Sequence, residues 1–184
     1  MQTEFFDYEP NDMTVRVSEL LIATSDDSDQ FIDAAVQEML SLLRAKMQMD
    51  IVFVSEFSEG ELVLKYLDSP VDAPVQRGQK FPLEETWCQR VVKGRLPPFI
   101  ANCNEYFATA ELLKKVPFPI GTFYSVPIVL ANGSVYGTLC CLSYEPLDTP
   151  DAKDLNRLKY TAQMTANRID KKTLSPGDPN LTRH

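Results

Sequence analysis

The chain has 184 residues, of which 44% are hydrophobic and 24% charged, and its net charge is −8. This length fits one domain with terminal extensions and excludes two full domains. The negative charge argues against binding to nucleic acid or to an anionic membrane surface, because both need clustered Lys and Arg.

The first residues, Met-Gln-Thr-Glu-Phe-Phe-Asp, do not have the pattern of a secretory signal, and no stretch approaches the roughly 20 apolar residues of a membrane span. We therefore expect a cytoplasmic protein. Residues 1–28 are predicted to form an N-terminal arm with a short helix over 12–23. The first long helix is predicted over 29–47, where apolar side chains recur at helical spacing along one face.

Two strands, 51–57 and 62–67, are predicted next, joined by a tight turn over 58–61. Residues 68–80 contain Pro70, Pro74 and Gly78 and are predicted to form a loop. A short helix over 82–94, a brief strand over 99–101 and another short helix over 108–116 follow.

The strongest pattern in the sequence is a hairpin of two strands, 122–130 and 135–144, on either side of Asn132-Gly133. Both strands are rich in aromatic and β-branched residues, and Asn-Gly favours a type I′ turn. Because both faces of these strands are apolar or small and neutral, we expect one face to pack on helices and the other to line a second core or a pocket. Thr149-Pro150-Asp151 then predicts the start of a long helix that ends near Lys172, and residues 173–184 are predicted to be a disordered tail.

This order of elements resembles a GAF domain over residues 29–172. Three motifs carry the resemblance: Pro-Leu-Glu-Glu-Thr-Trp-Cys-Gln-Arg-Val-Val-Lys-Gly at 82–94, Ser-Val-Pro-Ile at 125–128, and Gly-Thr-Leu-Cys-Cys-Leu at 137–142. The resemblance implies an α+β fold of the PAS/GAF/profilin type, with a central antiparallel sheet of five or six strands. The terminal helices would pack together on one face, and residues 81–120 would close over a pocket on the other.

The resemblance also implies ligand classes that can be compared with this sequence. Members that attach a bilin use a cysteine, commonly followed by histidine, but the corresponding segment here, Glu105–Ile120, has neither, and Cys103 is followed by Asn104. The paired Asn-Lys and Asp-Glu signature of cyclic-nucleotide-binding members is not found. Members that bind haem need an axial ligand, usually histidine, which the fold does not supply. We therefore predict no bound cofactor.

The single histidine, His184, is the last residue, so Ser-His-Asp and Cys-His catalysis and His-ligated metal sites are not expected. The four cysteines, Cys88, Cys103, Cys140 and Cys141, contain no CxxC pair and predict neither a metal site nor a disulfide framework. Members of the family that reduce free methionine sulfoxide carry a cluster of cysteines at the pocket mouth. Pro119 stands near the place where the catalytic cysteine is expected.

Two hypotheses remain from the sequence. The first is a non-enzymatic sensory or regulatory module that binds a small molecule, or mediates dimerisation or a protein contact in trans; the second is a small redox enzyme or thiol switch that uses Cys88 or Cys103. Core packing is the commoner role for a residue such as Trp87, a large aromatic on a short helix, and is the favoured explanation for it. The residues predicted to contact a ligand are Trp87, Cys88, Asn102, Tyr106, Phe107, Tyr124, Ser125 and Cys141.

A homodimer is predicted because the two long helices carry more apolar residues than one face can bury. The apolar residues outside the expected faces are Leu40, Leu42, Met47, Tyr160 and Met164. A contiguous apolar patch on a helix pair commonly marks an interface. The alternative is that residues 12–23 cover the patch within the same chain.

Overall fold

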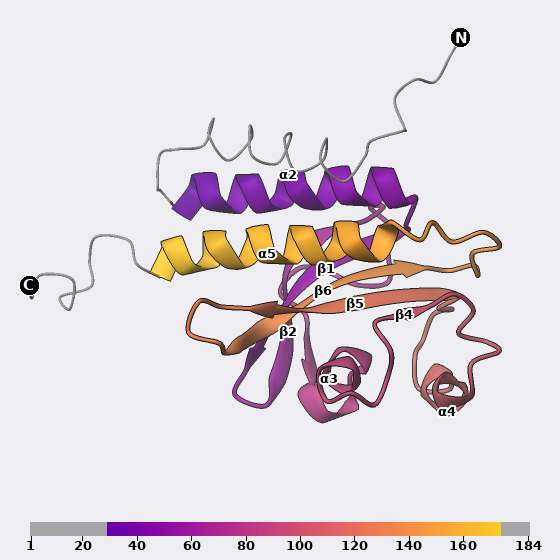
Figure 1. Ribbon diagram of the computed structural model, residues 1–184. Helices are drawn as coiled ribbons and strands as arrows, with labels where there is room; N and C mark the ends of the chain where they lie inside the picture. The colour runs from indigo at the N-terminus through magenta and orange to yellow at the C-terminus, as the bar shows by residue number, and fades with distance from the viewer. Residues whose placement is uncertain (1–28, 174–184) are drawn as a thin grey trace, which may run out of the picture.

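The computed structural model describes residues 29–173 as a six-stranded antiparallel sheet between two unlike layers (Figure 1). In chain order the elements are α2 (Asp29–Met47), β1 (Ile51–Ser58), β2 (Glu61–Asp68), β3 (Lys80–Pro82), the 3-10 helix η1 (Leu83–Glu85), α3 (Trp87–Val92), β4 (Phe99–Ile100), the 3-10 helix η2 (Phe107–Thr109), α4 (Ala110–Leu113), β5 (Thr122–Val129), β6 (Val135–Ser143) and α5 (Asp154–Thr173). The strand order is β3-β2-β1-β6-β5-β4. The predicted α+β fold with five or six strands is confirmed.

The two long helices, α2 and α5, lie side by side on one face of the sheet, and the short helices α3 and α4 lie on the other (Figure 1). Within residues 29–173, no helix combines the length and the apolar character that crossing a membrane requires. The predicted N-terminal arm, its helix over 12–23 and residues 174–184 of the predicted tail lie outside the described residues.

The type I′ turn is found in the first hairpin rather than in the second. Glu59 and Gly60, between β1 and β2, both have positive φ angles, 52° and 77°. In the β5–β6 hairpin only Gly133 has a positive φ angle, 83°, and its N–H donates to the Leu130 carbonyl at 2.9 Å. The predicted type I′ turn at Asn132-Gly133 is therefore wrong. The Leu130 N–H donates to the Ser134 carbonyl at 2.9 Å and leaves a loop of residues 131–133, a length that favours a type I turn followed by a glycine bulge.

Several element boundaries also differ from the prediction. The helix expected over 82–94 is divided into η1 and α3 by Thr86, whose hydroxyl accepts a hydrogen bond from the Gln89 N–H at 3.3 Å and so caps α3. The strand β3 was not predicted, and the helix expected over 108–116 is reduced to η2 and α4. The last helix begins at Asp154 rather than at Pro150, because the Asp151 carboxylate accepts from the Lys153 N–H at 2.8 Å and holds a turn before the helix.

A bulge in β2 changes which side of the sheet its residues face. Tyr66 pairs with Val54, but the next β1 residue, Ser55, pairs with Leu64, so Lys65 is an extra residue on β2. As a result Leu64 packs with the α3 side and Tyr66 with the α2–α5 side, although they are two residues apart. The Tyr66 hydroxyl then donates to the Asp33 carboxylate of α2 at 2.5 Å.

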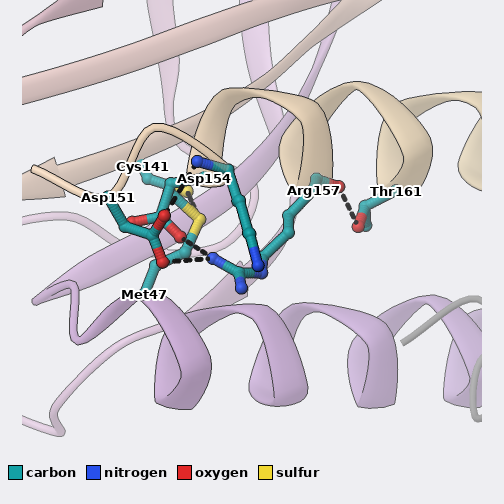
Figure 2. A network of polar contacts seen from close by, with 7 residues as sticks. Met47, Cys141, Asp151, Asp154, Arg157 and Thr161 are labelled. Atoms are coloured by element: carbon teal, nitrogen blue, oxygen red, sulfur yellow. Dashed lines mark hydrogen bonds and ion pairs between the residues drawn. The ribbon is translucent and has the colours of Figure 1, made fainter. Parts of the chain in front are cut away.

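The face covered by α2 and α5 contains a group of three charged residues at the start of α5, of which Arg157 and Asp154 are buried and Asp151 is exposed. The Arg157 guanidinium contacts the Asp154 carboxylate at 2.6 Å and the Asp151 carboxylate at 3.0 Å, and the Arg157 side chain is only 3% exposed. Figure 2 shows both carboxylates converging on one end of this guanidinium, close to Met47 and Cys141. Burial raises the pKa of Asp154, whereas the hydrogen bond and charge of Arg157 oppose that rise. The group joins the start of α5 to the core between the two long helices.

Candidate functional site

A cavity of about 240 Å³ lies between the sheet and the short helices, on the face opposite α2 and α5. Its floor is formed by apolar residues of four strands: Phe53, Leu62, Leu64, Phe123 and Leu142. Its walls come from β3 and the segment before it, from η1 and α3, and from α4 and the segment that follows it: Pro74, Val75, Gln79, Phe81, Pro82, Glu85, Thr86, Trp87, Cys88, Leu112, Lys115, Val116, Pro117, Phe118 and Ile120.

The cavity exists because short elements cover this face. The helices α3 and α4 have six and four residues, too few to lay a continuous apolar stripe across the sheet. The loop before β3 is held against β2 by two backbone hydrogen bonds, from Gly78 N–H to the Leu64 carbonyl at 2.7 Å and from Leu64 N–H to the Gln79 carbonyl at 3.0 Å. The wall on that side is thus part of the sheet edge, while the opposite wall depends on short helical turns.

Trp87 forms a large part of the wall beneath α3. Its ring meets the Phe123 ring edge to face, with 5.3 Å between the centroids and 70° between the planes. This geometry is the favourable one for two aromatic rings. The Trp87 side chain is 8% exposed and lines the cavity, so it is both a packing residue and a surface that a bound molecule would touch.

The polar groups of the cavity lie at its rim. Glu85, Lys115 and Gln79 line the cavity but are exposed to solvent, while the floor residues Leu62, Leu64 and Phe123 are buried. An apolar interior with a few polar groups is the usual composition of a small-molecule site. The rim carries one negative and one positive charge.

A row of buried thiols and hydroxyls lies beside this cavity. The Cys88 sulfur of α3 is 3.1 Å from the Cys140 sulfur of β6. Cys140 in turn contacts the Ser125 hydroxyl at 3.1 Å and the Thr138 hydroxyl at 3.2 Å. The Thr138 hydroxyl continues the row to Ser55 at 2.7 Å. All five side chains are buried, and only Cys88 also lines the cavity.

The environments of the cysteines give them different pKa values. The hydrogen bond from Cys140 lowers the pKa of the Cys88 thiol, with smaller effects from Thr138 and Ser125, and this outweighs burial. Burial raises the pKa of Cys140 well above its ordinary value. Burial also raises the pKa of Cys103 to about 12. Cys88 is therefore the thiol best placed to ionise next to the cavity.

The structure brings together three of the residues predicted to contact a ligand. Trp87 and Cys88 line the cavity, and Ser125 lies behind Cys140 on the same face of the sheet. Contrary to expectation, Tyr124 and Cys141 face the helix layer and do not line this cavity. Tyr124 stacks on Phe99 with 4.4 Å between the ring centroids. Successive residues of a strand face opposite sides of the sheet, and it is Phe123 that faces the cavity.

The remaining predicted residues lie between β4 and α4, outside the cavity wall. Asn102 accepts a hydrogen bond from the Asn104 N–H at 3.1 Å and so stabilises a turn. Tyr106 is 39% exposed and Phe107 is 94% exposed. Sequence reasoning did not single out the floor residues of β1 and β2 or the loop over 74–79. The alternation of Leu62 and Leu64 was visible as a strand pattern, but it does not show what lies above the strand.

Comparisons with known proteins agree with this architecture. The family model described as "GAF domain" matches residues 31–169. No curated protein matches the sequence. Among solved structures, the chain is similar to the GAF domain from an Acinetobacter phosphoenolpyruvate-protein phosphotransferase, with a TM-score of 0.68 and 14% identity over 89% of this chain and 96% of that one.

Two further similar structures differ in what their descriptions say they bind. One is a free methionine-R-sulfoxide reductase from Neisseria meningitidis in complex with its substrate, with a TM-score of 0.67 and 14% identity over 95% of this chain and 99% of that one. The other is a phycocyanobilin-bound GAF domain from a cyanobacterial phytochrome, with a TM-score of 0.69 and 12% identity over 93% of this chain and 99% of that one. At sequence identities this low, the similarity to these structures shows a shared fold only.

Proposed function

The chain belongs to the GAF domain family, and from this membership together with the cavity above the sheet we propose that it is a non-enzymatic sensory or regulatory module that binds a small molecule. The single observation that carries the proposal is the apolar cavity of about 240 Å³ with a polar rim. Because the cavity lies between the sheet and the short helices, a bound molecule would contact α3 and the segment after α4. Binding would then order these short elements.

The size of the cavity limits the ligand. Sites for drug-sized molecules usually measure about 300–1,000 Å³, so this cavity suits a smaller molecule. We propose a compact amphipathic compound with an apolar group against Leu64, Trp87 and Phe123. Its polar or charged groups would lie at the rim, where Glu85 and Lys115 offer charges of opposite sign. An apolar amino acid has this combination of features.

A covalently attached bilin is not part of this proposal. Cys103, the cysteine nearest to the segment where such members attach a bilin, is fully buried, is not among the cavity residues, and has a pKa raised by burial to about 12. We expect protein co-expressed with bilin synthesis to show no visible absorbance. A fluorescent adduct that disappears in Cys103→Ser would contradict this expectation.

The binding proposal is tested by native mass spectrometry of freshly purified protein and by thermal shift with L-phenylalanine, L-leucine and L-methionine. We expect a retained small molecule, or a rise in melting temperature with at least one of the three amino acids. Leu64→Phe should abolish the effect because the larger ring occupies the cavity. Val63→Phe is the matched control, since this side chain belongs to the same strand but not to the cavity. The absence of any retained molecule and of any shift would reject the binding of such compounds.

Thiol chemistry is the second candidate function, and the contact of Cys88 with Cys140 favours it. Cys88 lines the cavity, whereas Cys103 does not, so a reductase activity like that of the methionine-R-sulfoxide reductase would start at Cys88. The assay is the loss of free methionine sulfoxide in the presence of dithiothreitol. Turnover that is lost in Cys88→Ser but kept in Cys103→Ser would favour this candidate over a sensory module.

We further propose that the protein is cytoplasmic and acts in trans on a signalling partner, or as a homodimer. The structure weakens the argument for the dimer, because Leu40 and Met47, two of the residues expected to be in surplus, are 0% and 3% exposed within this one chain. Tyr160 of α5 remains 52% exposed. Light scattering tests the dimer: a mass near that of the 20.8 kDa chain at micromolar concentrations would reject it.

A further inference from the structure

We propose that Cys88 and Cys140 form an oxidation site for small peroxides, at which a reversible disulfide fixes α3, the wall of the cavity, to the central strand β6. This inference goes beyond the binding of a ligand. It rests on the position of two thiols that are 52 residues apart in the sequence and in contact in the fold.

The geometry favours bond formation between these two residues. Their sulfur atoms are 3.1 Å apart, and the bond length of a disulfide is about 2.05 Å, so the atoms need to approach by about 1 Å. Cys140 lies in a central strand, but Cys88 lies in the first turn of a helix of only six residues. A small shift of α3 therefore brings the sulfurs together without disturbing the sheet.

The cavity supplies a route for the oxidant. Cys88 is 4% exposed and lines the cavity, while Cys140 is fully buried behind it. Cys103 and Cys141 are also fully buried, and neither borders the cavity. A peroxide that enters the cavity thus meets Cys88 first, and Cys140 is the neighbouring thiol that can complete the reaction.

The hydroxyl groups around Cys140 distinguish this place from the rest of the pocket face. The floor of the cavity is formed by Phe and Leu side chains, whereas beside it Ser125 and Thr138 lie within 3.2 Å of the Cys140 sulfur. Polar groups in such surroundings stabilise a charged or polar sulfur. The pKa of Cys88 is lowered, which favours its thiolate, and the thiolate is the form that attacks a peroxide.

The reaction balances in two steps. The Cys88 thiolate attacks one peroxide oxygen, the O–O bond breaks, and a sulfenic acid and one water or alcohol molecule are formed. The Cys140 sulfur then attacks the Cys88 sulfur, the S–O bond breaks, and a second molecule of water leaves. Two thiols lose two electrons and two protons, and the peroxide accepts them. An external dithiol restores the two thiols by exchange.

The experiment treats the native full chain with one equivalent of hydrogen peroxide and then alkylates free thiols in denaturant. We expect two of the four cysteines to escape alkylation, with an intact mass lower by about 2 Da before alkylation and a cross-linked peptide joining Cys88 to Cys140. Dithiothreitol should restore all the thiols. The emission of Trp87, the only tryptophan, should change on oxidation because it is adjacent to Cys88.

Variants separate this site from general oxidation. Cys103→Ser, the matched control, should still form the disulfide and show the change in Trp87 emission. Cys140→Ser should instead accumulate a sulfenic or sulfinic acid at Cys88. In Cys88→Ser, the other cysteines should stay in the thiol form after peroxide treatment. Thermal shift with L-phenylalanine on Cys140→Ser measures pocket binding separately, so that failure of the disulfide and failure of ligand binding give different results.

Three results would overturn the proposal. The first is native protein that keeps all its thiols while the denatured chain reacts. The second is wild-type oxidation that stops at a sulfinic acid on Cys88 with Cys140 unchanged. The third is a disulfide that forms between chains or uses Cys103. The peptide map of the wild-type protein decides among these even if a serine variant does not fold.

Discussion

The two faces of the sheet are built from the same strands but differ in how completely they are covered. On one face α2 and α5, of 19 and 20 residues, pack regular apolar stripes onto the strands and bury a continuous core, and a separate open depression of about 480 Å³ lies at its edge, between α5, β5 and the segment after α3. On the other face, helices of six and four residues and the loops between them leave a cavity of about 240 Å³. The long helices cover the middle of their face of the sheet, whereas the short elements leave a cavity directly above the strands of theirs.

The faces also differ in the polar groups that they bury. The helix face buries the charged pair of Arg157 and Asp154 and has a half-buried pair of Lys172 and Asp33, whose carboxylate also accepts from the Tyr66 hydroxyl. The pocket face instead buries neutral thiols and hydroxyls next to the cavity. This comparison predicts that mutations of similar size have different effects on the two faces.

The largest effect is expected where a buried charge loses its partner. Arg157→Met leaves the Asp154 carboxylate, 8% exposed, without its closest ion pair, and should lower the free energy of unfolding by about 3–5 kcal/mol. Lys114→Met is the control, since the Lys114–Glu111 pair is 70% and 81% exposed and should change stability by less than about 1 kcal/mol. Urea unfolding at pH 7 measures both. Equal effects would show that the buried group does not hold the helix face together.

Deletion of one aromatic ring on each face should show the next largest difference. Tyr124→Ala removes a side chain that is 1% exposed and closely packed on Phe99, at a cost of about 3 kcal/mol. Trp87→Ala removes a larger side chain, but one side of it already faces the cavity, so fewer contacts are lost and the cost should be smaller. Thermal and urea unfolding of the two variants test the order. A greater loss for Trp87→Ala would mean that the pocket face is packed as well as the helix face.

Enlarging a side chain should cost less stability on the pocket face than on the helix face. Leu139→Phe, in the closed core, should destabilise by about 1–3 kcal/mol because no space is available. Leu64→Phe directs its extra volume into the cavity, so its effect should stay within about 1 kcal/mol. Calorimetry of the two variants makes the comparison. Strong destabilisation by Leu64→Phe would indicate that the cavity cannot accept an added ring.

The smallest effect concerns pH and the helix face. Burial raises the pKa of Asp33, but hydrogen bonds from Tyr66 and Lys172 outweigh it, and the net pKa lies below the ordinary value of 3.8. The folded protein thus binds fewer protons at Asp33 than the unfolded chain, and the stabilisation is present above pH 3.8 and is lost as the pH falls through the lowered pKa.

Asp33→Asn should therefore cost less than about 1 kcal/mol at pH 7, and the difference from wild type should vanish in strong acid. Urea unfolding from pH 7 down to pH 2 measures this difference. A gap between the two proteins that stays constant over the whole range would show that the contribution of Asp33 is not electrostatic.

The sequence by itself determined the elements whose patterns are long and regular. The apolar stripe of α2, the β5–β6 hairpin and the motifs at 82–94 and 137–142 were sufficient to predict the order of elements, the antiparallel sheet and the family. They also placed Trp87 and Cys88 correctly above the sheet. Local periodicity is a property of neighbouring residues, so it can be read without knowledge of the fold.

The tertiary structure alone decided which face of each strand meets the pocket. Both faces of β5 and β6 are apolar, so alternation shows that Phe123 and Tyr124 point to opposite sides but does not show which side has the cavity. The same ambiguity applies to Cys140 and Cys141: only the structure shows that Cys140 contacts Cys88 and that Cys141 faces the helices. The bulge at Lys65 depends on pairing between strands, and the contact of Cys88 with Cys140 joins residues 52 positions apart. Such features arise from long-range packing, which no local pattern encodes.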